Sequence, residues 1–171
     1  MIIFETERLI VRSYTKDDYD NYFSLHGNDV VMQYIRPAQT REESDAKFEE
    51  TILYAAPHPY LGRWAVVEKR SGNFIGSFVI IPIPDDPEKI QLGYSFLPEY
   101  WGKGFATEVS KEGVYYFYYK TPLSEIYGVT ETPNIASQKV LLKNGFHFFE
   151  KKMEGEKELM LFVLKRDPST D

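Results

Sequence analysis

The chain of 171 residues contains no cysteine, only two tryptophans and only three histidines. The absence of cysteine excludes a disulfide framework, a thiolate zinc site, an iron–sulfur cluster and a catalytic thiol. The three histidines, His26, His58 and His147, lie far apart in the sequence, and no Asp-rich calcium loop is present. We therefore expect no dedicated metal site.

Basic residues are also fewer than acidic residues. Lys and Arg number 20 against 26 Asp and Glu, which gives a formal net charge of -6. We therefore expect no general attraction to nucleic acid or to an anionic membrane. No apolar run approaches the length of a membrane span, and Glu5 and Glu7 stand where a signal peptide would continue its apolar core. These patterns favour a cytoplasmic protein.

The remaining composition is typical of one folded domain. Hydrophobic residues make up 43% of the chain and aromatic residues 16%, which is enough to fill a single core. No repeat, linker or low-complexity tract divides the sequence. We expect one domain over residues 1–166 and a frayed tail over residues 167–171.

The first part of the chain favours one strand followed by helices. Its residue pattern predicts a strand over residues 8–12. Helical spacing, caps and breakers predict three helices after it, over residues 16–27, 30–35 and 41–55. The third has a clear start, because Thr40 and Glu43 form a capping box.

The rest of the chain predicts a sheet. Strands are expected over residues 63–68, 74–81, 89–96, 125–130, 146–152 and 157–164, and helices over residues 103–119 and 134–143. Residues 82–88 read as a loop rich in Pro and Asp. Most strands are joined by short links, which makes them antiparallel, whereas one helix connects two strands as a crossover. The fold class is therefore α+β, with a mixed, mostly antiparallel twisted sheet, a central β-α-β crossover and helices on both faces.

The crossover helix opens with a glycine-rich turn, Trp101-Gly102-Lys103-Gly104-Phe105-Ala106-Thr107. Two glycines permit a tight turn, and the start of a helix supplies unpaired N–H donors and about half a positive charge. Lys103 adds a full charge. The turn therefore predicts a phosphate site, against the alternative that the glycines serve only a tight connection.

Other glycine-rich motifs fit this sequence less well. A Walker loop needs Ser or Thr where Gly104 stands, and a dinucleotide fingerprint needs glycine where Thr107 stands. An NAD-linked enzyme would also need a ribose-binding acid after the next strand, where Glu131 lies. Residues 93–97 fail as a nucleophile elbow because Leu97 replaces the required glycine.

The turn resembles the acetyl-CoA loop of the GNAT acetyltransferases, Q/R-x-x-G-x-G/A, with Trp101 in its first position. Residues 6–12 and 134–146 are similar to the branch of this family that includes ribosomal-protein N-terminal acetyltransferases. The three motifs follow the family's order and span nearly the whole chain. The resemblance implies a GNAT-like domain and an acetyl-CoA-dependent N-acetyltransferase.

The resemblance also implies where acetyl-CoA, the co-substrate, binds. The pyrophosphate would be held by the backbone N–H groups of Gly102, Lys103, Gly104, Phe105, Ala106 and Thr107. The pantetheine arm would pair like a strand with Phe96 and Leu97, where the sheet splays open. A main-chain N–H near Phe96 would then polarise the thioester carbonyl.

Candidate catalytic residues come from the third motif. The resemblance implies that Asn134 lies beside the pantetheine and Ser137 near the sulfur, although Asn134 also reads as a helix N-cap. Many relatives carry a tyrosine four residues after the Ser137 position, and it protonates the departing thiolate. Here that residue is Leu141, so the acid role passes to Ser137, to a water or to no group.

No strong base is evident for the attacking amine. Deprotonating a lysine-like amine at pH 7 costs roughly 4–5 kcal/mol, against about 1 kcal/mol for an α-amine, so a weak base favours a low-pKa amine. Glu131 is our candidate for binding the amine or deprotonating it through water, against the alternative of a solvated carboxylate. Glu68 and Glu99 are weaker candidates. The acidic balance of the chain favours a cationic acceptor over an anionic one.

Two functions from different classes follow from these patterns. The first is direct acetyl transfer, without an acyl-enzyme, to a primary amine of a protein N-terminus or a small molecule. The alternative is a noncatalytic acyl-CoA-binding regulatory module on the same fold. The aromatic residues 115–119 are expected to supply core on one face and an interface, such as a homodimer contact, on the other.

Overall fold

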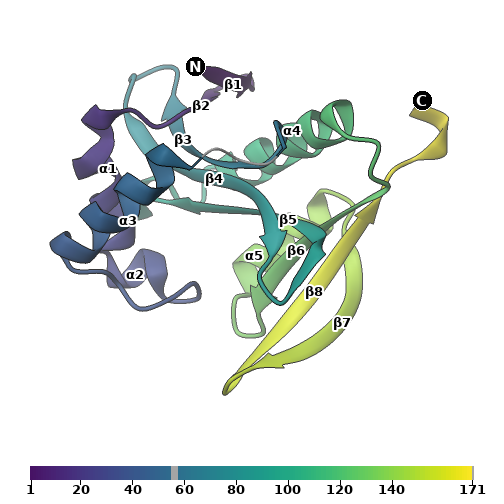
Figure 1. The fold of residues 1–171 in the computed structure, drawn as a ribbon. Coiled ribbons are helices and arrows are strands. Elements are labelled where there is room, and N and C mark those ends of the chain that lie inside the picture. Colours follow the sequence, from purple (N-terminus) through teal and green to yellow (C-terminus); the bar gives the residue numbers. More distant parts are fainter. Residues whose placement is uncertain (55–57, 171) are drawn as a thin grey trace.

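The computed structural model describes residues 1–54 and 58–170, whose strands form one sheet in the order β1-β2-β3-β4-β5-β6-β8-β7 (Figure 1). The strands are β1 (Ile2–Glu5), β2 (Leu9–Arg12), β3 (Gly62–Glu68), β4 (Phe74–Ile83), β5 (Asp86–Phe96), β6 (Glu125–Glu131), β7 (His147–Glu154) and β8 (Lys157–Lys165). Neighbours are antiparallel except β5 and β6, which run parallel. The predicted mixed sheet is confirmed.

The helices are α1 (Tyr19–His26), α2 (Asp29–Met32), α3 (Arg41–Leu53), α4 (Phe105–Lys120) and α5 (Ile135–Lys143). They cover both faces of the sheet, as expected. On β4, the Phe78 ring lies against Gly113 of α4, whereas Ser77 points to the opposite face and lines a cavity together with Tyr22 of α1. The helix α4 joins β5 to β6, which confirms the central crossover.

Three differences from the sequence expectations concern the strands and the first helix. Residues 82–88 are not a loop, because β4 and β5 continue through them as a hairpin with a tight turn at Pro84 and Asp85. Pro82 is tolerated in the strand because the register shifts next to it. The strand β1 was not predicted, and the helix expected over 16–27 begins as a 3-10 turn, Lys16–Asp18.

Two further predictions concern the end of the third helix and the C-terminal tail. The third helix ends at Leu53, two residues before the predicted end at Ala55, because Tyr54 is already extended, and Pro57, which was expected to close that region, lies outside the described residues. At the C-terminus, Pro168–Thr170 form a 3-10 turn in which Ser169 N–H donates to the Asp167 carboxylate at 2.8 Å. The domain boundary at residue 166 stays a prediction.

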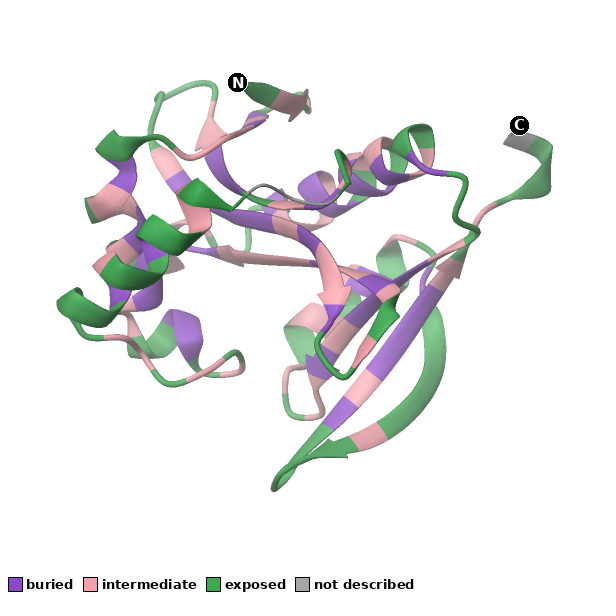
Figure 2. Ribbon diagram, viewed as in Figure 1, coloured by how far each residue is buried: buried purple, intermediate pink, exposed green. Residues whose placement is uncertain are grey.

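The main core lies between the sheet and α4. Fully buried members include Phe78, Ile80, Val109 and Phe117, and Figure 2 shows buried residues along the central strands. In the aromatic segment, Phe117 is buried whereas Tyr115 and Tyr119 are exposed, so the expected core face is confirmed and the expected interface on the other face stays a prediction. Within the described part of the chain, every helix is too short or too polar to cross a bilayer.

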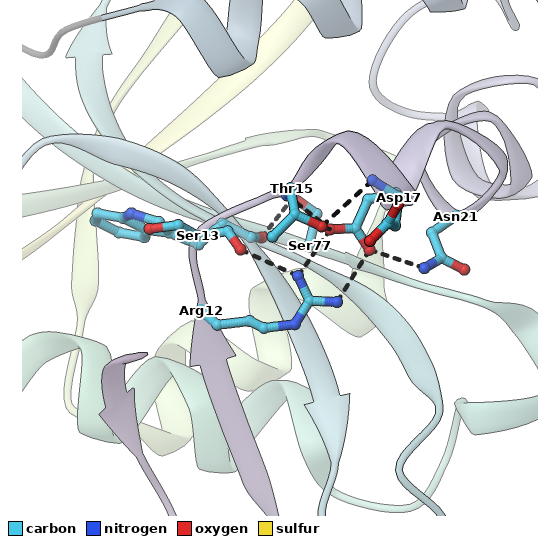
Figure 3. A network of polar contacts seen from close by, with 8 residues as sticks. Arg12, Ser13, Thr15, Asp17, Asn21 and Ser77 are labelled. Carbon is cyan, nitrogen blue, oxygen red and sulfur yellow. Dashed lines mark hydrogen bonds and ion pairs between the residues drawn. The ribbon is translucent and has the colours of Figure 1, made fainter. Parts of the chain in front are cut away.

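A buried ion pair fixes the chain between β2 and α1 (Figure 3). Both terminal nitrogens of Arg12 donate to Asp18, at 2.7 and 2.9 Å, and the Asp18 carboxylate also accepts from Thr15 N–H and Asn21 Nδ2. Burial alone would raise the pKa of Asp18, but these donors outweigh it and hold the pKa at about 2. The side chain of Asp18 is only 2% exposed.

We expect the Asp18→Asn variant to lose about 2 kcal/mol of unfolding free energy at pH 7. The folded pKa lies below the unfolded value, so this contribution is full above about pH 4 and is lost as the pH falls toward 2. Urea unfolding across that range measures it. The exposed neighbour Asp17 is the control, and Asp17→Asn should change stability by less than about 0.5 kcal/mol. An Asp18→Asn deficit that stays constant down to pH 2 would contradict the assignment.

Candidate active site

The sheet opens between its two parallel strands. The strands β5 and β6 pair only at Gln91 with Tyr127 and at Leu92 with Gly128, although both continue beyond these residues. Past this point the neighbouring edges of β5 and β6 no longer bond to each other. This opening is the one that a strand-like ligand can enter, because backbone groups there lack sheet partners.

The end of β5 presents alternate residues to the opening. Leu97 N–H donates to Ile75 of β4 at 2.9 Å, and the Leu97 carbonyl accepts from Tyr100 N–H at 2.9 Å. Both backbone groups of Leu97 are thus occupied, so Phe96 and Tyr94, rather than Leu97, turn their backbone groups toward β6. The Phe96 carbonyl accepts from the indole Nε1 of Trp101 at 2.7 Å, which ties the glycine-rich turn to the end of the strand.

The glycine-rich turn leads directly into α4. Gly102 and Gly104 have φ of 69° and 81°, in the left-handed region that side chains disfavour, and Gly104 is the N-cap of the helix. Gly102, Gly104, Phe105, Ala106 and Thr107 line a cavity of about 830 Å³ that continues into the opening between the strands. The turn therefore offers unpaired helix N–H groups to an anion in this cavity.

Lys103 points elsewhere. Its Nζ lies 5.3 Å from the centre of the Tyr100 ring, and its side chain is not part of the cavity lining. The full positive charge expected from Lys103 is thus not directed into the cavity, and any attraction for phosphate comes from the backbone N–H groups. The Lys103 carbonyl accepts from Arg8 Nη1 at 2.9 Å.

The N-terminal motif supports this turn from behind. The Arg8 guanidinium lies 4.3 Å from the centre of the Phe105 ring, and its Nε donates to Glu108 of α4 at 2.6 Å. Burial would raise the pKa of Glu108, but hydrogen bonds from Thr6 and Arg8 outweigh it and lower that pKa. Two of the three motifs that are separated in the sequence therefore form one unit.

The third motif brings Ser137 into the same cavity. Asn134 Oδ1 accepts from Ser137 N–H at 3.2 Å, which confirms Asn134 as the N-cap of α5. Ser137 Oγ lies 3.2 Å from the hydroxyl of Tyr94, which reaches it from β5. Burial raises the pKa of Tyr94, so this phenol keeps its proton at neutral pH. Tyr94 was not predicted as a site residue, although the alternation along β5 places Leu92, Tyr94 and Phe96 on one face.

Leu141 belongs to the core rather than to the chemistry. It is buried and packs so closely on Gly128 that a Cβ there would lie 2.5 Å from Leu141 Cδ2. Glu131 lies at the end of β6, lines the cavity and pairs with Lys157 Nζ at 3.4 Å. Glu131 is thus a partly buried, paired carboxylate rather than a solvated one. Glu68 and Glu99 are not among the described residues that line the cavity.

The described residues contain no group of three or more His, Cys, Asp or Glu side chains that could hold a metal ion. The arrangement suits a ligand with an anionic end at the glycine-rich turn and a strand-like arm in the opening of the sheet. A reacting group at the end of this arm would lie near the Ser137 and Tyr94 hydroxyls.

Comparison with known proteins agrees with this geometry. Residues 8–147 match the family model of the acetyltransferase (GNAT) domain. The uncharacterized N-acetyltransferase YoaA of Bacillus subtilis is 31% identical over 147 residues, covering 84% of this chain and 82% of YoaA. These matches rest on sequence and span most of the chain.

Two solved structures share the fold. Spermidine N-acetyltransferase from Vibrio cholerae, in complex with CoA and spermine, has a TM-score of 0.75 at 19% identity, covering 92% of this chain and 95% of that one. RimL, a ribosomal L7/L12 α-N-protein acetyltransferase in complex with coenzyme A, has a TM-score of 0.78 at 14% identity, covering 96% and 98%. With the sequence matches, they establish that the chain belongs to the GNAT family of acetyl-CoA-dependent N-acetyltransferases.

Proposed function

We propose that this enzyme transfers the acetyl group of acetyl-CoA directly to a primary amine, with both substrates bound in the cavity between β5 and β6. The single observation that carries the proposal is the convergence of three features on that cavity. These are the glycine-rich turn at the start of α4, the unpaired edge of β5 and the hydroxyl pair of Ser137 and Tyr94.

The chain's own groups match acetyl-CoA along its length. The N–H groups of residues 102–107 would hold the pyrophosphate, since Gly102 and Gly104 carry no side chain that would block its approach. Backbone groups of Tyr94 would pair with the amides of the pantetheine arm, since the Phe96 carbonyl already accepts from Trp101 and the Phe96 N–H is left for the thioester. Acetyl-CoA supplies a thioester, which is activated toward attack by an amine.

The catalytic roles follow from position. Phe96 N–H faces the opening and would donate to the oxygen that becomes negative when the amine nitrogen attacks the carbonyl carbon. As the carbon–sulfur bond breaks, the departing thiolate would take its proton from the Ser137 and Tyr94 hydroxyl pair. Glu131 would bind the protonated amine, which would pass its proton to water before attack, and Asn134 would position Ser137 as the N-cap of its helix.

The acceptor class is an amine, as in the relatives whose names state one. A polyamine acceptor is named for the Vibrio cholerae structure and a ribosomal protein N-terminus for RimL. We propose that this enzyme acts in the cytoplasm on a small molecule or a protein N-terminus. The lack of cysteine agrees with a reducing compartment.

Glu131→Gln should raise KM for the amine several-fold while lowering kcat by less than about 3-fold, because a carboxylate that binds the amine contributes mainly to affinity. Steady-state kinetics with varied amine measure this split. Glu158→Gln is the control, since Glu158 pairs with Lys151 and does not line the cavity. A loss confined to kcat would instead identify Glu131 as an essential base.

The proposed function itself is tested by thiol release. Purified enzyme is mixed with acetyl-CoA and a panel of primary amines, and the N-acetylated product is identified by mass. We expect free CoA and acetylated amine in equal amounts. Tight binding of acetyl-CoA without thiol release on any amine would favour the noncatalytic module.

A further inference from the structure

The cavity has a second end that the acetyl-CoA site does not use. It is formed by α1, α2 and the segment after α2, above the sheet face opposite α4. Two arginines line it, Arg36 from the segment after α2 and Arg63 from β3. Neither arginine belongs to any of the three motifs found in the sequence.

The register of the sheet connects Arg63 to the reaction centre. On β3, Trp64 stacks against Phe78 on the α4 side, so its neighbour Arg63 faces the other side. Arg63 lies opposite Val79 of β4, and Val79 lies opposite Gly93 of β5. Val79 and Gly93 both line the cavity, which follows this row from Arg63 to the edge of β5, with the Val79 side chain lying over Gly93.

Neither arginine has an anionic partner in the protein. Across residues 1–54 and 58–170, neither guanidinium makes an ion pair or a side-chain hydrogen bond, and the buried Nε of Arg36 has no acceptor. Arg8, Arg12 and Arg41 each pair with a carboxylate at 2.6–2.7 Å. Arg70 also makes no ion pair among the described residues, but it lies in the exposed turn after β3, whereas Arg36 and Arg63 both line the cavity.

Each of the two arginines acts on the other with its positive charge, and the aromatic rings of Tyr22 and His26 line or border the same end of the cavity. The pKa of Arg63 is lowered, first by removal from water and then by the positive charge of Arg36. His26 stacks on Tyr22, and burial together with both arginines lowers its pKa to about 4, so it is neutral at pH 7. Arg63 is an exposed residue and Arg36 a half-buried one, so water partly screens the repulsion between their like charges, and an anion bound to both would lower it further.

We propose that Arg36 and Arg63 bind an anionic group of the amine acceptor, either a carboxylate or a phosphate ester. The inference rests on the proposed acetyl transfer and narrows its substrate class. It reverses the expectation, drawn from the net charge of the whole chain, that a cationic acceptor is favoured over an anionic one. The cavity is lined by six Lys and Arg side chains and only two Glu side chains, so its charge differs in sign from that of the chain.

The spacing of the strands limits the acceptor. Neighbouring strands lie about 4.8 Å apart, so the backbone of Arg63 is about 10 Å from β5, and the arginine side chain spans part of that distance. An amine and an anion separated by a few methylene groups fit between the opening and Arg63. A polyamine would place a second positive charge beside the two arginines.

The test compares acceptors that differ only in the distal group. The panel contains ω-amino acids with two to six methylene groups, the matching ω-amino carboxamides, the matching ω-aminoalkyl phosphates and spermidine. Thiol release gives kcat/KM for each. Calorimetry with the N-acetylated ω-amino acids and CoA measures binding independently of turnover. The carboxylate and phosphate arms distinguish the two sources of negative charge.

We expect the best anionic acceptor to exceed its carboxamide about 100-fold in kcat/KM, mainly through KM, as for a bidentate arginine contact. Arg63→Gln should remove this preference, and Arg63→Lys should restore part of it. Arg70→Gln, in the exposed turn after β3, removes the same charge outside the cavity and should keep the preference. Arg63→Gln should not lower Tm, because no protein contact of its guanidinium is lost.

The outcomes separate this inference from the proposed function. Equal rates for anionic and neutral amines, a preference for spermidine, or a preference that survives both Arg63→Gln and Arg36→Gln would overturn the anion site while leaving acetyl transfer intact. Binding of the anionic compounds that depends on Arg63, without thiol release on any amine, would support the anion site and overturn the transferase. Absence of both binding and turnover would overturn the anion site as well.

Discussion

Replacing Gly104 with valine is expected to weaken acetyl-CoA binding about 100-fold, the equivalent of losing one or two charge-assisted hydrogen bonds to phosphate. Gly104 has φ of 81°, which a β-branched residue adopts only with strain, and a Cβ there would already lie 3.4 Å from Arg8 Nη2. The turn would have to move, and the N–H groups at the start of α4 would no longer point to one anion. Calorimetry with acetyl-CoA measures the loss.

A matched control separates this effect from general strain. Gly72, in the turn between β3 and β4, has φ of 71° and open space around its Cβ position. Gly72→Val therefore carries a similar backbone cost away from the cavity, and should lower Tm without changing acetyl-CoA affinity. Wild-type affinity in a folded Gly104→Val protein would show that the turn is not part of the binding site.

The second large effect concerns the departing thiolate. Ser137→Ala and Tyr94→Phe should each lower kcat by about 10- to 100-fold, because one general acid contributes at least this much to a proton transfer. Acetyl-CoA affinity should stay within about 2-fold, since each change removes one hydroxyl that acts in the chemical step. Single-turnover kinetics with an active amine measure the chemical step directly.

The two hydroxyls lie 3.2 Å apart and are expected to act as a unit. The double variant should then be no slower than the slower single variant, rather than showing the product of the two losses. Tyr118→Phe is the control, because the Tyr118 hydroxyl donates to Leu164 at 2.7 Å outside the cavity. Unchanged kcat in both single variants, with chemistry rate-limiting, would assign the proton to water.

The crossover and its glycine-rich turn could be predicted from the sequence because their signals are local. The residues 98–107 contain the breaker, the glycines and the helix start in one segment, and the structure has α4 begin within two residues of the predicted start. Asn134 was also readable, since an N-cap is defined by its immediate neighbours. Residues 82–88 were wrongly predicted to form a loop, because Pro82 is tolerated in a strand at a shift of register.

The site residues that were missed depend on contacts between distant segments. Tyr94 and Ser137 are 43 positions apart, and alternation alone assigns Tyr94 to an apolar strand face. Tyr94 replaces Leu97 as the expected backbone partner of the pantetheine arm because alternate residues of β5 turn their backbone groups toward β4 and toward β6. Which residues face β6 depends on the register of β5 against β4. Arg36 and Arg63 line one cavity because β3 and the segment after α2 both border it, and no spacing in the sequence marks that.

The most direct test of the account is the fate of the acetyl group in a single mixing experiment. The enzyme is incubated with isotopically labelled acetyl-CoA, with and without an acceptor amine, quenched in acid and measured by intact mass spectrometry. Direct transfer predicts unlabelled protein in both samples, with labelled N-acetyl product and free CoA in equal amounts only when the amine is present. Labelled protein in the absence of amine, or no labelled product with any amine of the panel, would contradict it.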